Sequence, residues 1–210
     1  MDWHSSDIQS LHLIDQELGD HKFTPAEYEI IRRVIYATGD FDYPTLIQFS
    51  PQALAAGVAA LSVRTPIIVD VPLVQMGILP QLQTTFANPV YCGSETFTRP
   101  QTEKSRAAFG VETLSRRHPT AIFVIGASQT TLSPLLELVQ ADEIKPALII
   151  HTPVGFLPQG REELEKSWLP NIMLNGQKGG PGVAAAILSG LIDLAWGAYG
   201  HDLKDQARSR

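Results

Sequence analysis

The chain has 210 residues, of which 44% are hydrophobic, 18% are charged and 8% are aromatic. This length and balance suit a globular protein with a substantial core and exclude a disordered one. With 16 lysines and arginines against 22 acidic residues, the formal net charge of −6 argues against a nucleic-acid-binding surface. We expect one domain over residues 1–210.

Helices are predicted before any strand. Asp7 is a candidate cap for a first helix that runs to Leu18. Thr24–Glu27 has the form of a capping box with proline at the first helical position, so a second helix is predicted to about Thr38. A Ser-Pro pair at 50–51 gives the start signal of a third helix.

From Thr65 onward, short apolar runs alternate with helical patterns, which is typical of an α/β fold. The predicted strands are Pro66–Val69, Pro89–Cys92, Ala121–Ile125, Ala147–Ile150 and Asn171–Leu174. The predicted helices are Leu73–Met76, Lys104–Arg117, Leu132–Gln140 and Glu162–Trp168, and a long helix after Gly182 with a polar, fraying tail. We therefore expect a three-layer α/β domain, with helices on both faces of a parallel sheet of about five strands.

The stretch from Ala121 to Phe156 indicates where chemistry is expected. Its two apolar runs flank a helical pattern that Thr130 or Thr131 can cap, and this order makes a βαβ unit with parallel strands. Functional residues of parallel sheets lie beyond the carboxyl ends of the strands. Here these ends are residues 126–131 and 151–156.

Two features of the sequence predict the cellular compartment of the protein. Cys92 is the single cysteine and cannot form a disulfide within the chain, which fits a reducing compartment. The first residues lack the pattern of a signal peptide, so we expect a cytoplasmic protein. The longest apolar stretch, Val183–Tyr199, falls short of the roughly 20 residues of a membrane span. It predicts a packed helix, in the core or at a subunit contact.

Two cationic or glycine-rich segments have alternative readings. The run of residues 176–182, GQKGGPG, is either a tight turn or an anion site before a helix, and it matches no nucleotide-binding register. Lys104, Ser105 and Arg106 open a helix close behind Arg99. They form either a carboxylate-binding cluster or a solvated helix end.

Three single residues also have two readings each. Asp70 closes the first predicted strand, where it is either an acid or acceptor in the site or a cap for the following helix. His151 closes the fourth strand and is either catalytic or a hydrogen-bonded structural histidine. Tyr36, taken alone, is expected to be a core aromatic whose hydroxyl is satisfied.

Six segments, in order along nearly the whole chain, resemble the precorrin-8X methylmutase family. They are RRVIYATGDFDYPTLIQFSPQAL at 32–54, TPIIVDVPLVQMGI at 65–78, SRAAFGVE at 105–112, IFVIGASQTTL at 122–132, KPALIIHTPVGF at 145–156 and GQKGGPGVAAAI at 176–187. The PVGF segment after a Pro-Ala-Leu-Ile strand, together with the KGG loop before an alanine-rich helix, is the most specific part.

The resemblance implies a parallel α/β homodimer with active sites near the subunit contact. The family moves a methyl group from C11 to C12 of precorrin-8X or its cobalt counterpart by a sigmatropic shift, giving hydrogenobyrinate or cobyrinate, and it needs no cofactor. Our candidate catalytic residues are Tyr36 and His151. Our candidate substrate-binding residues are Asp70, Ser105, Arg106, Thr130, Gly155, Gln177, Lys178, Gly179 and Gly180, of which Arg106, Lys178 and the glycine-run amides suit the acetate and propionate arms of the implied substrate. No metal ligands are implied.

The chain departs from the family at three places. Tyr36 stands where the family has a histidine, and a phenol with a pKa of about 10 is a weaker proton donor than imidazolium. Asn175 and Gln177 replace two arginines, and Ala127–Thr130 replaces Asn-Ala-Pro-Thr. Our first hypothesis is a working methylmutase in which Tyr36, helped by His151, supplies the donor. The alternatives are a non-catalytic corrinoid-binding carrier or regulatory relative and, more weakly supported, a nucleotide-binding enzyme.

Overall fold

The computed structural model describes residues 4–96, 104–156 and 160–208, so the predicted cationic neighbour Arg99 lies outside the described residues. Within these ranges, six short strands form one sheet in the order β1-β6-β5-β4-β2-β3. The strands are Ile47–Phe49 (β1), Ile67–Val69 (β2), Val90–Cys92 (β3), Ile122–Ile125 (β4), Leu148–His151 (β5) and Asn171–Leu174 (β6). All pairings are parallel except that of β1 with β6. The predicted α/β class is confirmed.

Strand β1 was missed by the sequence prediction. It has three residues and pairs antiparallel with β6, with Gln48 opposite Met173. Unlike the equally short β2 and β3, it lies among the N-terminal helical patterns, ahead of the alternation of strands and helices that begins at Thr65. The five predicted strands are all present, and the sixth completes the edge of the sheet beside β6.

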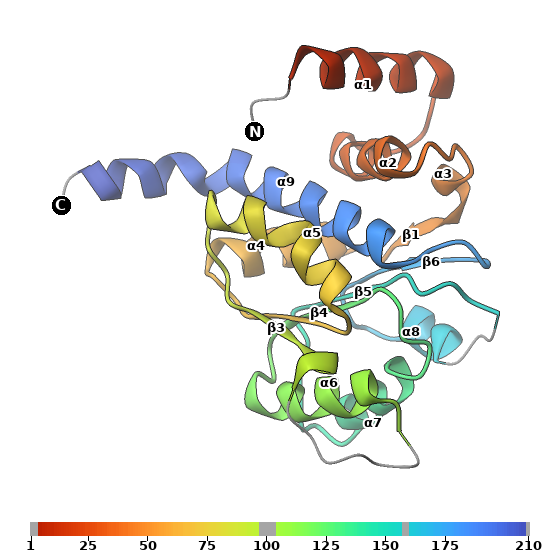
Figure 1. Cartoon of the computed structure of the whole chain (residues 1–210), viewed down its shortest axis with the longest axis vertical. Coiled ribbons are helices and arrows are strands. Elements are labelled where there is room, and N and C mark those ends of the chain that lie inside the picture. The colour runs from red at the N-terminus through yellow and green to blue at the C-terminus, as the bar shows by residue number, and fades with distance from the viewer. Residues whose placement is uncertain (1–3, 97–103, 157–159, 209–210) are drawn as a thin grey trace.

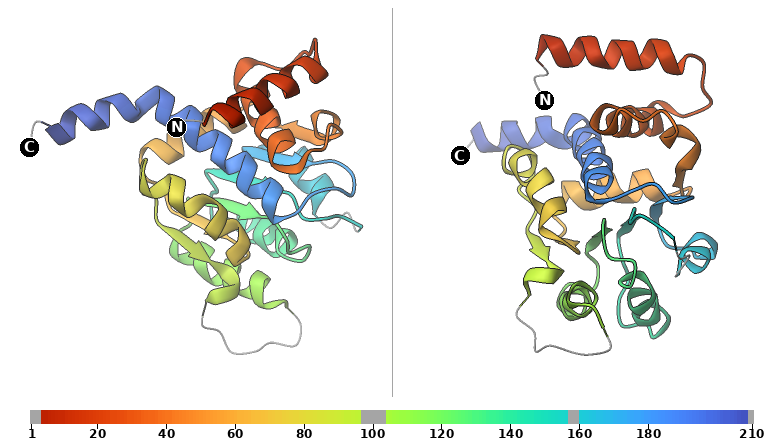
Figure 2. Two further views of the ribbon diagram at one scale, coloured as in Figure 1. Left: turned by 45° about the horizontal axis from the view of Figure 1, so that its top comes forward. Right: turned by 45° about the vertical axis from the view of Figure 1, so that its right-hand side comes forward.

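The helices lie in layers on the two faces of the sheet. Figure 1 shows α2, α4, α5 and α9 on one side and α6, α7 and α8 on the other, while α1 lies outermost against α2 (Figure 2). Their bounds are Ser5–Leu18 (α1), Pro25–Thr38 (α2), Tyr43–Leu46 (α3), Ala53–Ser62 (α4), Pro72–Gln83 (α5), Arg106–Arg117 (α6), Leu132–Gln140 (α7), Arg161–Lys166 (α8) and Pro181–Arg208 (α9), with a 3-10 turn at Gly93–Glu95. The three-layer arrangement is therefore the expected one.

Two helices are longer than the sequence suggested. Helix α5 runs through Gly77 and Pro80, two residues that normally interrupt a helical pattern. At Gly77 a Cβ would lie 2.8 Å from the Cβ of Ala185, so glycine lets α5 cross closely over α9. Helix α9 continues to Arg208, so residues 201–208 of the polar tail are helical, and their fraying stays a prediction.

The cap of α2 agrees with prediction and that of α1 does not. The capping box of α2 is formed as expected, with the Thr24 backbone N–H donating to Glu27 Oε2 at 2.8 Å. Helix α1 instead begins after His4, which acts as its cap, and Asp7 is the third helical residue. The backbone N–H of His4 donates to Asp7 Oδ2 at 3.2 Å. The side chain of Asp7 is thereby held at the start of α1.

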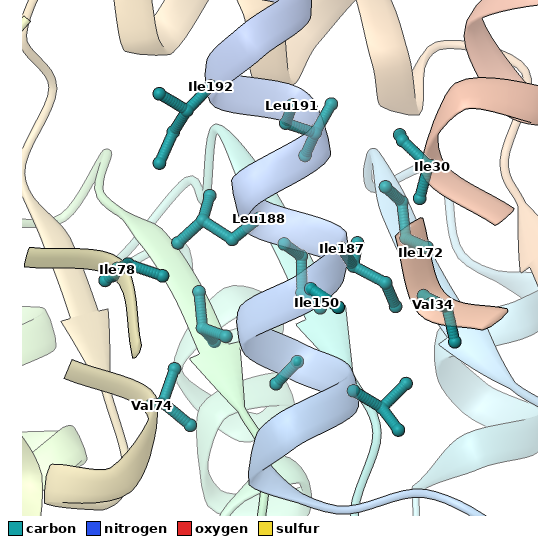
Figure 3. Packing of buried hydrophobic residues seen from close by; sticks show 14 of the residues in the cluster. Ile30, Val34, Val74, Ile78, Ile150, Ile172, Ile187, Leu188, Leu191 and Ile192 are labelled. Carbon is teal, nitrogen blue, oxygen red and sulfur yellow. The ribbon is translucent and has the colours of Figure 1, made fainter. Parts of the chain in front are cut away.

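Helix α9 is the centre of the larger core cluster. Its residues Ile187, Leu188, Leu191 and Ile192 contact side chains of the sheet and of the neighbouring helices (Figure 3). Burying each such side chain contributes about 1.5–3 kcal/mol. Within the described residues, one stretch, Pro181–Gly200, is long and apolar enough to cross a membrane, but half of its most apolar window is buried inside the protein. It is the predicted packed core helix.

The order of the strands creates a switch point between β2 and β4. The chain leaves β2 for β3 on one side and returns to place β4 on the other, and both pairings are parallel. Ligand sites of open parallel sheets lie at the carboxyl ends of the strands next to such a reversal. Residues Asp70 and Gly126 follow β2 and β4 at this point.

Candidate active site

Asp70 lies at the switch point, and its side chain is hydrogen-bonded to the backbone of the loop that follows β4. The residue is fully buried, and its carboxylate accepts hydrogen bonds from the backbone N–H groups of Gly126 at 3.0 Å, Ala127 at 2.8 Å and Ser128 at 2.6 Å. Helix α5 therefore begins without a side-chain cap from Asp70. Of its two predicted roles, Asp70 serves as an acceptor, and what it accepts from is the protein backbone.

The loop held by Asp70 supports the start of α9. A Cβ at Gly126 would lie 3.0 Å from Cα of Pro181 and 3.1 Å from Cβ of Ala184, so only a residue without a side chain allows this close approach. The carboxyl ends of β2 and β4 and the first turn of α9 are thus packed into one unit. A change at Asp70 would be transmitted to the first turn of α9.

Ser105, Arg106 and Thr130 are brought together at the next part of this edge. Ser105 caps α6 by accepting from the Ala108 backbone N–H at 3.2 Å, and its Oγ lies 2.9 Å from Oγ1 of Thr130. Arg106 is the first residue of α6 and is exposed. Thr131 occupies the cap position of α7, but its hydroxyl donates to Ser128 Oγ instead of capping the helix. Two hydroxyls and one guanidinium here face solvent.

The glycine run at 176–180 packs against the loop after β5. The backbone N–H of Gly180 donates to the Thr152 carbonyl at 2.6 Å, and that of Gly155 donates to the Gln177 carbonyl at 3.1 Å. A Cβ at Gly179 would overlap the Thr152 carbonyl oxygen. Gly179 and Gly180, with φ of 157° and 121°, also adopt backbone conformations that favour glycine. The run is therefore a tight turn, and Gln177 is exposed on it.

Lys178 is paired within the protein. Its Nζ donates to Oδ2 of Asp40 and to Oδ2 of Asp42, each at 2.6 Å. These bonds raise the pKa of Lys178 and lower that of Asp40. The lysine thus ties the glycine run to the segment after α2, and two carboxylates already share its charge.

Tyr36 lines a pocket of about 250 Å³ between α2, α5 and the first turns of α9. The side chain is 40% exposed, so the core position expected from its sequence context alone is wrong. Its hydroxyl donates to Oδ1 of Asp7 at 2.8 Å, and this bond, with a smaller contribution from burial, raises the pKa of the phenol. The other lining residues are Arg33, Ala37, Gly77, Gly182, Ala185, Ala186 and Ser189.

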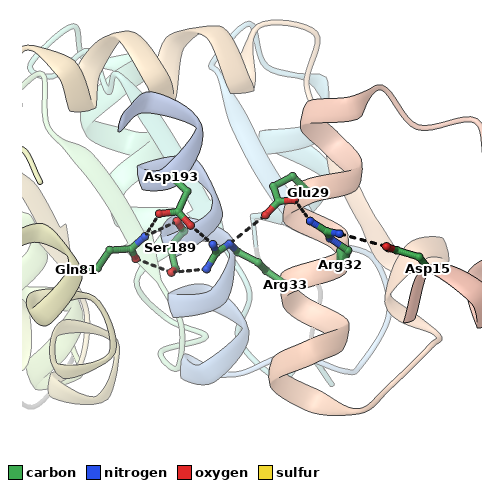
Figure 4. Close-up of polar contacts among 7 residues, drawn as sticks. All are labelled: Asp15, Glu29, Arg32, Arg33, Gln81, Ser189 and Asp193. Atoms are coloured by element: carbon green, nitrogen blue, oxygen red, sulfur yellow. Dashed lines mark hydrogen bonds and ion pairs between the residues drawn. The ribbon is translucent and has the colours of Figure 1, made fainter. Parts of the chain in front are cut away.

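A polar network forms one wall of this pocket (Figure 4). Arg33 is 6% exposed and forms ion pairs with Asp193 and, at 3.6 Å, with Glu29. Gln81 donates to Oδ1 of Asp193 at 2.6 Å and accepts from Ser189 Oγ at 2.5 Å. Buried charges are tolerated when they are paired and hydrogen-bonded, so this network fixes α2, α5 and α9 relative to one another. The sequence analysis did not identify it.

His151 lies on the opposite face of the sheet from Tyr36. Along β5 it shares a face with Ile149, and its paired neighbours Ile125 and Met173 belong to the core cluster under α6, α7 and α8. The ring is 2% exposed, and neither ring nitrogen has a hydrogen-bond partner among the described residues. Burial, reinforced by the charge of Arg161, lowers the pKa of His151 to about 3. The structure does not bring the two predicted catalytic residues together.

Arg161 is a further residue of this edge that the sequence analysis did not name. The first residue of α8, it donates from Nη1 to the Gly176 carbonyl at 2.7 Å and from Nη2 to the Pro153 carbonyl at 3.3 Å. A Cβ at Gly155 would overlap its guanidinium, which accounts for glycine at that position. Only the fold brings Arg161 to the glycine run, so no local sequence signal identified it.

No group of three or more histidine, cysteine or acidic side chains that could hold a metal ion occurs among the described residues. The exposed side chains at the carboxyl edge include two hydroxyls, a guanidinium and an amide, from Ser105, Thr130, Arg106 and Gln177, and Tyr36 places a phenol in the neighbouring pocket. Such groups suit an anionic, hydrogen-bonding ligand.

Comparison with known proteins identifies the family. The family model for precorrin-8X methylmutase matches residues 7–194. The cobalt-precorrin-8 methylmutase of Synechocystis sp. is 36% identical over 205 residues, covering 90% of this chain and 94% of the relative. The precorrin-8X methylmutase of Pseudomonas aeruginosa is 34% identical, covering 80% and 84%.

A solved structure agrees with these sequence relatives. The precorrin-8X methylmutase from Thermus thermophilus superposes with a TM-score of 0.83 at 30% identity, over 93% of this chain and 99% of that one. The family-model match over residues 7–194 includes the switch point, the glycine run and the pocket at Tyr36. The chain therefore belongs to the precorrin-8X methylmutase family, whose members are isomerases of cobalamin biosynthesis.

Proposed function

We propose that this protein, folded as one domain, is a methylmutase that moves a methyl group from C11 to C12 of precorrin-8X or cobalt-precorrin-8. The bond from the methyl group to C11 breaks as the bond to C12 forms, so the product is an isomer and the reaction consumes no co-reactant. The observation that carries the proposal is the family match over residues 7–194, which includes every loop described at the carboxyl edge. We expect no cofactor requirement.

Tyr36 is the proposed catalytic hydrogen-bonding group. It lines the pocket beside the first turns of α9, where its phenol can contact a tetrapyrrole nitrogen. Because a phenol is a weak acid at neutral pH, most of the rate enhancement would come from positioning and from a fixed polar environment. His151 stays a proposed site residue at the carboxyl end of β5, acting as a neutral imidazole from the other face of the sheet.

The proposed substrate contacts follow the carboxyl edge. Arg106, Ser105 and Thr130 present one cation and two hydroxyls, and Gln177 presents an amide on the glycine run. The acetate and propionate arms of a tetrapyrrole suit such donors. Asp70, Gly155, Gly179 and Gly180 would shape this surface through their backbone contacts, and Lys178 would hold the glycine run against α2.

The test is an absorbance time course of the purified protein with precorrin-8X and, separately, with cobalt-precorrin-8. Methyl migration changes the conjugated system, so turnover and binding give different spectra. We expect multiple turnovers with at least one substrate, and a Tyr36→Phe variant slowed about tenfold or more, since general-acid groups contribute about a hundredfold or more. Tyr28→Phe, which alters a tyrosine outside the pocket, serves as the control.

Two results would contradict the proposal. A spectrum that shifts once and stops at one equivalent of ligand would indicate a corrinoid carrier. Full activity of Tyr36→Phe would leave the methylmutase in place but remove the role of the phenol. The comparison of the two substrates also assigns the metal-free or the cobalt-containing branch of synthesis.

The protein is further proposed to act as a homodimer in the cytoplasm. Leu73 and Met76 project from α5 with 69% and 70% of their surfaces exposed, close to the Gly77 side of the pocket. Most of Val183–Tyr199 is buried within its own chain, so α5 is the better candidate for the contact. Sedimentation equilibrium should give a dimer for the wild type, and replacement of Met76 by glutamate should yield monomers. A monomeric wild type would refute the dimer.

A further inference from the structure

Arg161 places a guanidinium between two loops of the carboxyl edge. Its two hydrogen bonds reach the Gly176 carbonyl in the glycine run and the Pro153 carbonyl after β5. A guanidinium carries five N–H donors. These two bonds therefore leave donors that are not used in any contact with the described residues.

The charge of Arg161 is not neutralised by the described part of the chain. Its two side-chain hydrogen bonds both go to carbonyl oxygens. The adjacent acids have other partners, because Glu162 pairs with Lys166 at 3.6 Å and Glu163 accepts from Gln140. Burial alone lowers the pKa of Arg161, and the same uncompensated charge acts on His151. A partly buried cation in this state is stabilised by an incoming anion.

The two cations on this glycine run differ in what they can offer a ligand. Lys178 shares its charge with Asp40 and Asp42. Arg161 reaches the same run from the other side and has no carboxylate among the residues that the structure describes. A carboxylate accepts two parallel N–H bonds from a guanidinium, which adds geometric selectivity to charge.

We propose that Arg161 is a substrate-binding residue that receives one carboxylate arm of the tetrapyrrole beside the backbone at Pro153 and Gly176. The inference rests on the proposed function, since it assigns one arm of that substrate. The glycine run leads directly into the first turn of α9, where Gly182 lines the Tyr36 pocket, so a ligand that extends from the pocket past Gly182 would reach this run. Gly155 provides the space that the guanidinium needs.

The experiment measures the binding of cobyrinate, one of the two proposed products, and of its fully methyl-esterified form by corrin absorbance. The variants are Arg161→Gln and Arg161→Lys, with Arg117→Gln, an exposed arginine at the end of α6, as the matched control. Losing a charge-assisted contact should raise the Kd of Arg161→Gln for cobyrinate by about tenfold to a hundredfold. Arg161→Lys should be intermediate, and Arg117→Gln unchanged.

The ester separates carboxylate recognition from general effects on the pocket. Wild type should prefer cobyrinate over the ester, and Arg161→Gln should lose most of that preference. Should Arg161→Gln prove unstable, the Nε–H NMR resonance of Arg161, assigned with the lysine variant, gives the answer in wild type. It should move with cobyrinate and not with the ester.

The outcomes distinguish this inference from the proposed function. If wild type binds cobyrinate and turns over substrate while Arg161→Gln binds both ligands with unchanged affinity, Arg161 only ties the loops together and the inference is wrong. If wild type binds neither ligand and turns over neither substrate, the proposed function fails as well. Retained preference for cobyrinate in Arg161→Gln would place the anchor elsewhere.

Discussion

The phenol of Tyr36 on α2 donates a hydrogen bond to Oδ1 of Asp7 on α1, 2.8 Å away. The other oxygen of Asp7 accepts from the His4 backbone N–H at 3.2 Å, so the carboxylate is fixed by the helix that carries it. A phenol has a single proton, and here that proton faces Asp7. The N-terminal helix therefore sets the direction of the hydrogen bond of the residue proposed to act on the substrate.

This relationship predicts the titration of Tyr36. The bond to Asp7 raises the pKa of the phenol above about 10, because the phenolate would lose a hydrogen bond and face a carboxylate. Any stability that the bond contributes is fully present below pH 10 and is lost as the pH rises through the raised pKa. In Asp7→Asn the pKa of Tyr36 should fall. The difference in phenolate absorbance between each protein and its Tyr36→Phe counterpart isolates this group.

A control variant and an opposing result complete this test. Asp20→Asn changes an exposed acid without a partner among the described residues, and it should leave the titration of Tyr36 unchanged. An unaltered Tyr36 titration in Asp7→Asn would show that the bond between α1 and α2 is not formed in solution.

The sequence predicted the parts of the fold that have a strong local signal. Ala121–Ile125 and Leu148–Ile150 are buried on both faces, and such continuous apolar runs are recognisable without a structure. The capping box at Thr24–Glu27 was equally clear. The short helix α3 was missed because four residues give no usable period, and strand β1 was missed because it lies among helical patterns, ahead of the alternation that begins at Thr65.

Several residues of the candidate site could be predicted from the sequence, but the contacts that they make could not. Asp70, Ser105 and Thr130 were identified as residues at strand or helix ends, where they lie. That Asp70 holds the backbone of residues 126–128, or that Arg161 contacts Gly176, depends on pairings between distant segments. Those pairings follow from strand order, and strand order is not encoded in local periodicity. The opposite placement of Tyr36 and His151 has the same origin.

Asp70 is predicted to be a large contributor to stability. Its buried carboxylate accepts three backbone N–H groups, and in Asp70→Asn the amide nitrogen must replace one acceptor oxygen. Hydrogen bonds to a charged group contribute about 1.5–3 kcal/mol each, and an unsatisfied buried donor costs a similar amount. We expect Asp70→Asn to lower the free energy of unfolding by about 3 kcal/mol in urea titrations.

The matched control for this variant is again Asp20→Asn, for which a change within about 0.5 kcal/mol is expected. Because Gly126 packs against Pro181 at the start of α9, Asp70→Asn should also reduce turnover at temperatures where the protein stays folded. Unchanged stability would mean that the three N–H groups find other partners, and the proposed support of the α9 start would then be wrong.

The lowered pKa of His151 predicts how the free energy of unfolding falls at acidic pH. Its pKa in the folded protein is about 3, against about 6.5 in an unfolded chain, because burial and the charge of Arg161 disfavour imidazolium. Above pH 6.5 both states are neutral and His151 has no pH-dependent effect. As the pH falls from about 6.5 towards 3 the unfolded state takes up the proton first, so stability is lost across this window.

Replacing His151 by phenylalanine removes this protonation and should flatten the loss of stability below pH 6.5 relative to wild type, as measured by urea unfolding at a series of pH values. His12→Gln, at an exposed histidine, should leave this loss of stability as in wild type. The ring resonances of His151 should show a neutral imidazole at pH 5. A ring that titrates near 6.5 would contradict the burial of His151, because it would show an imidazole in contact with water.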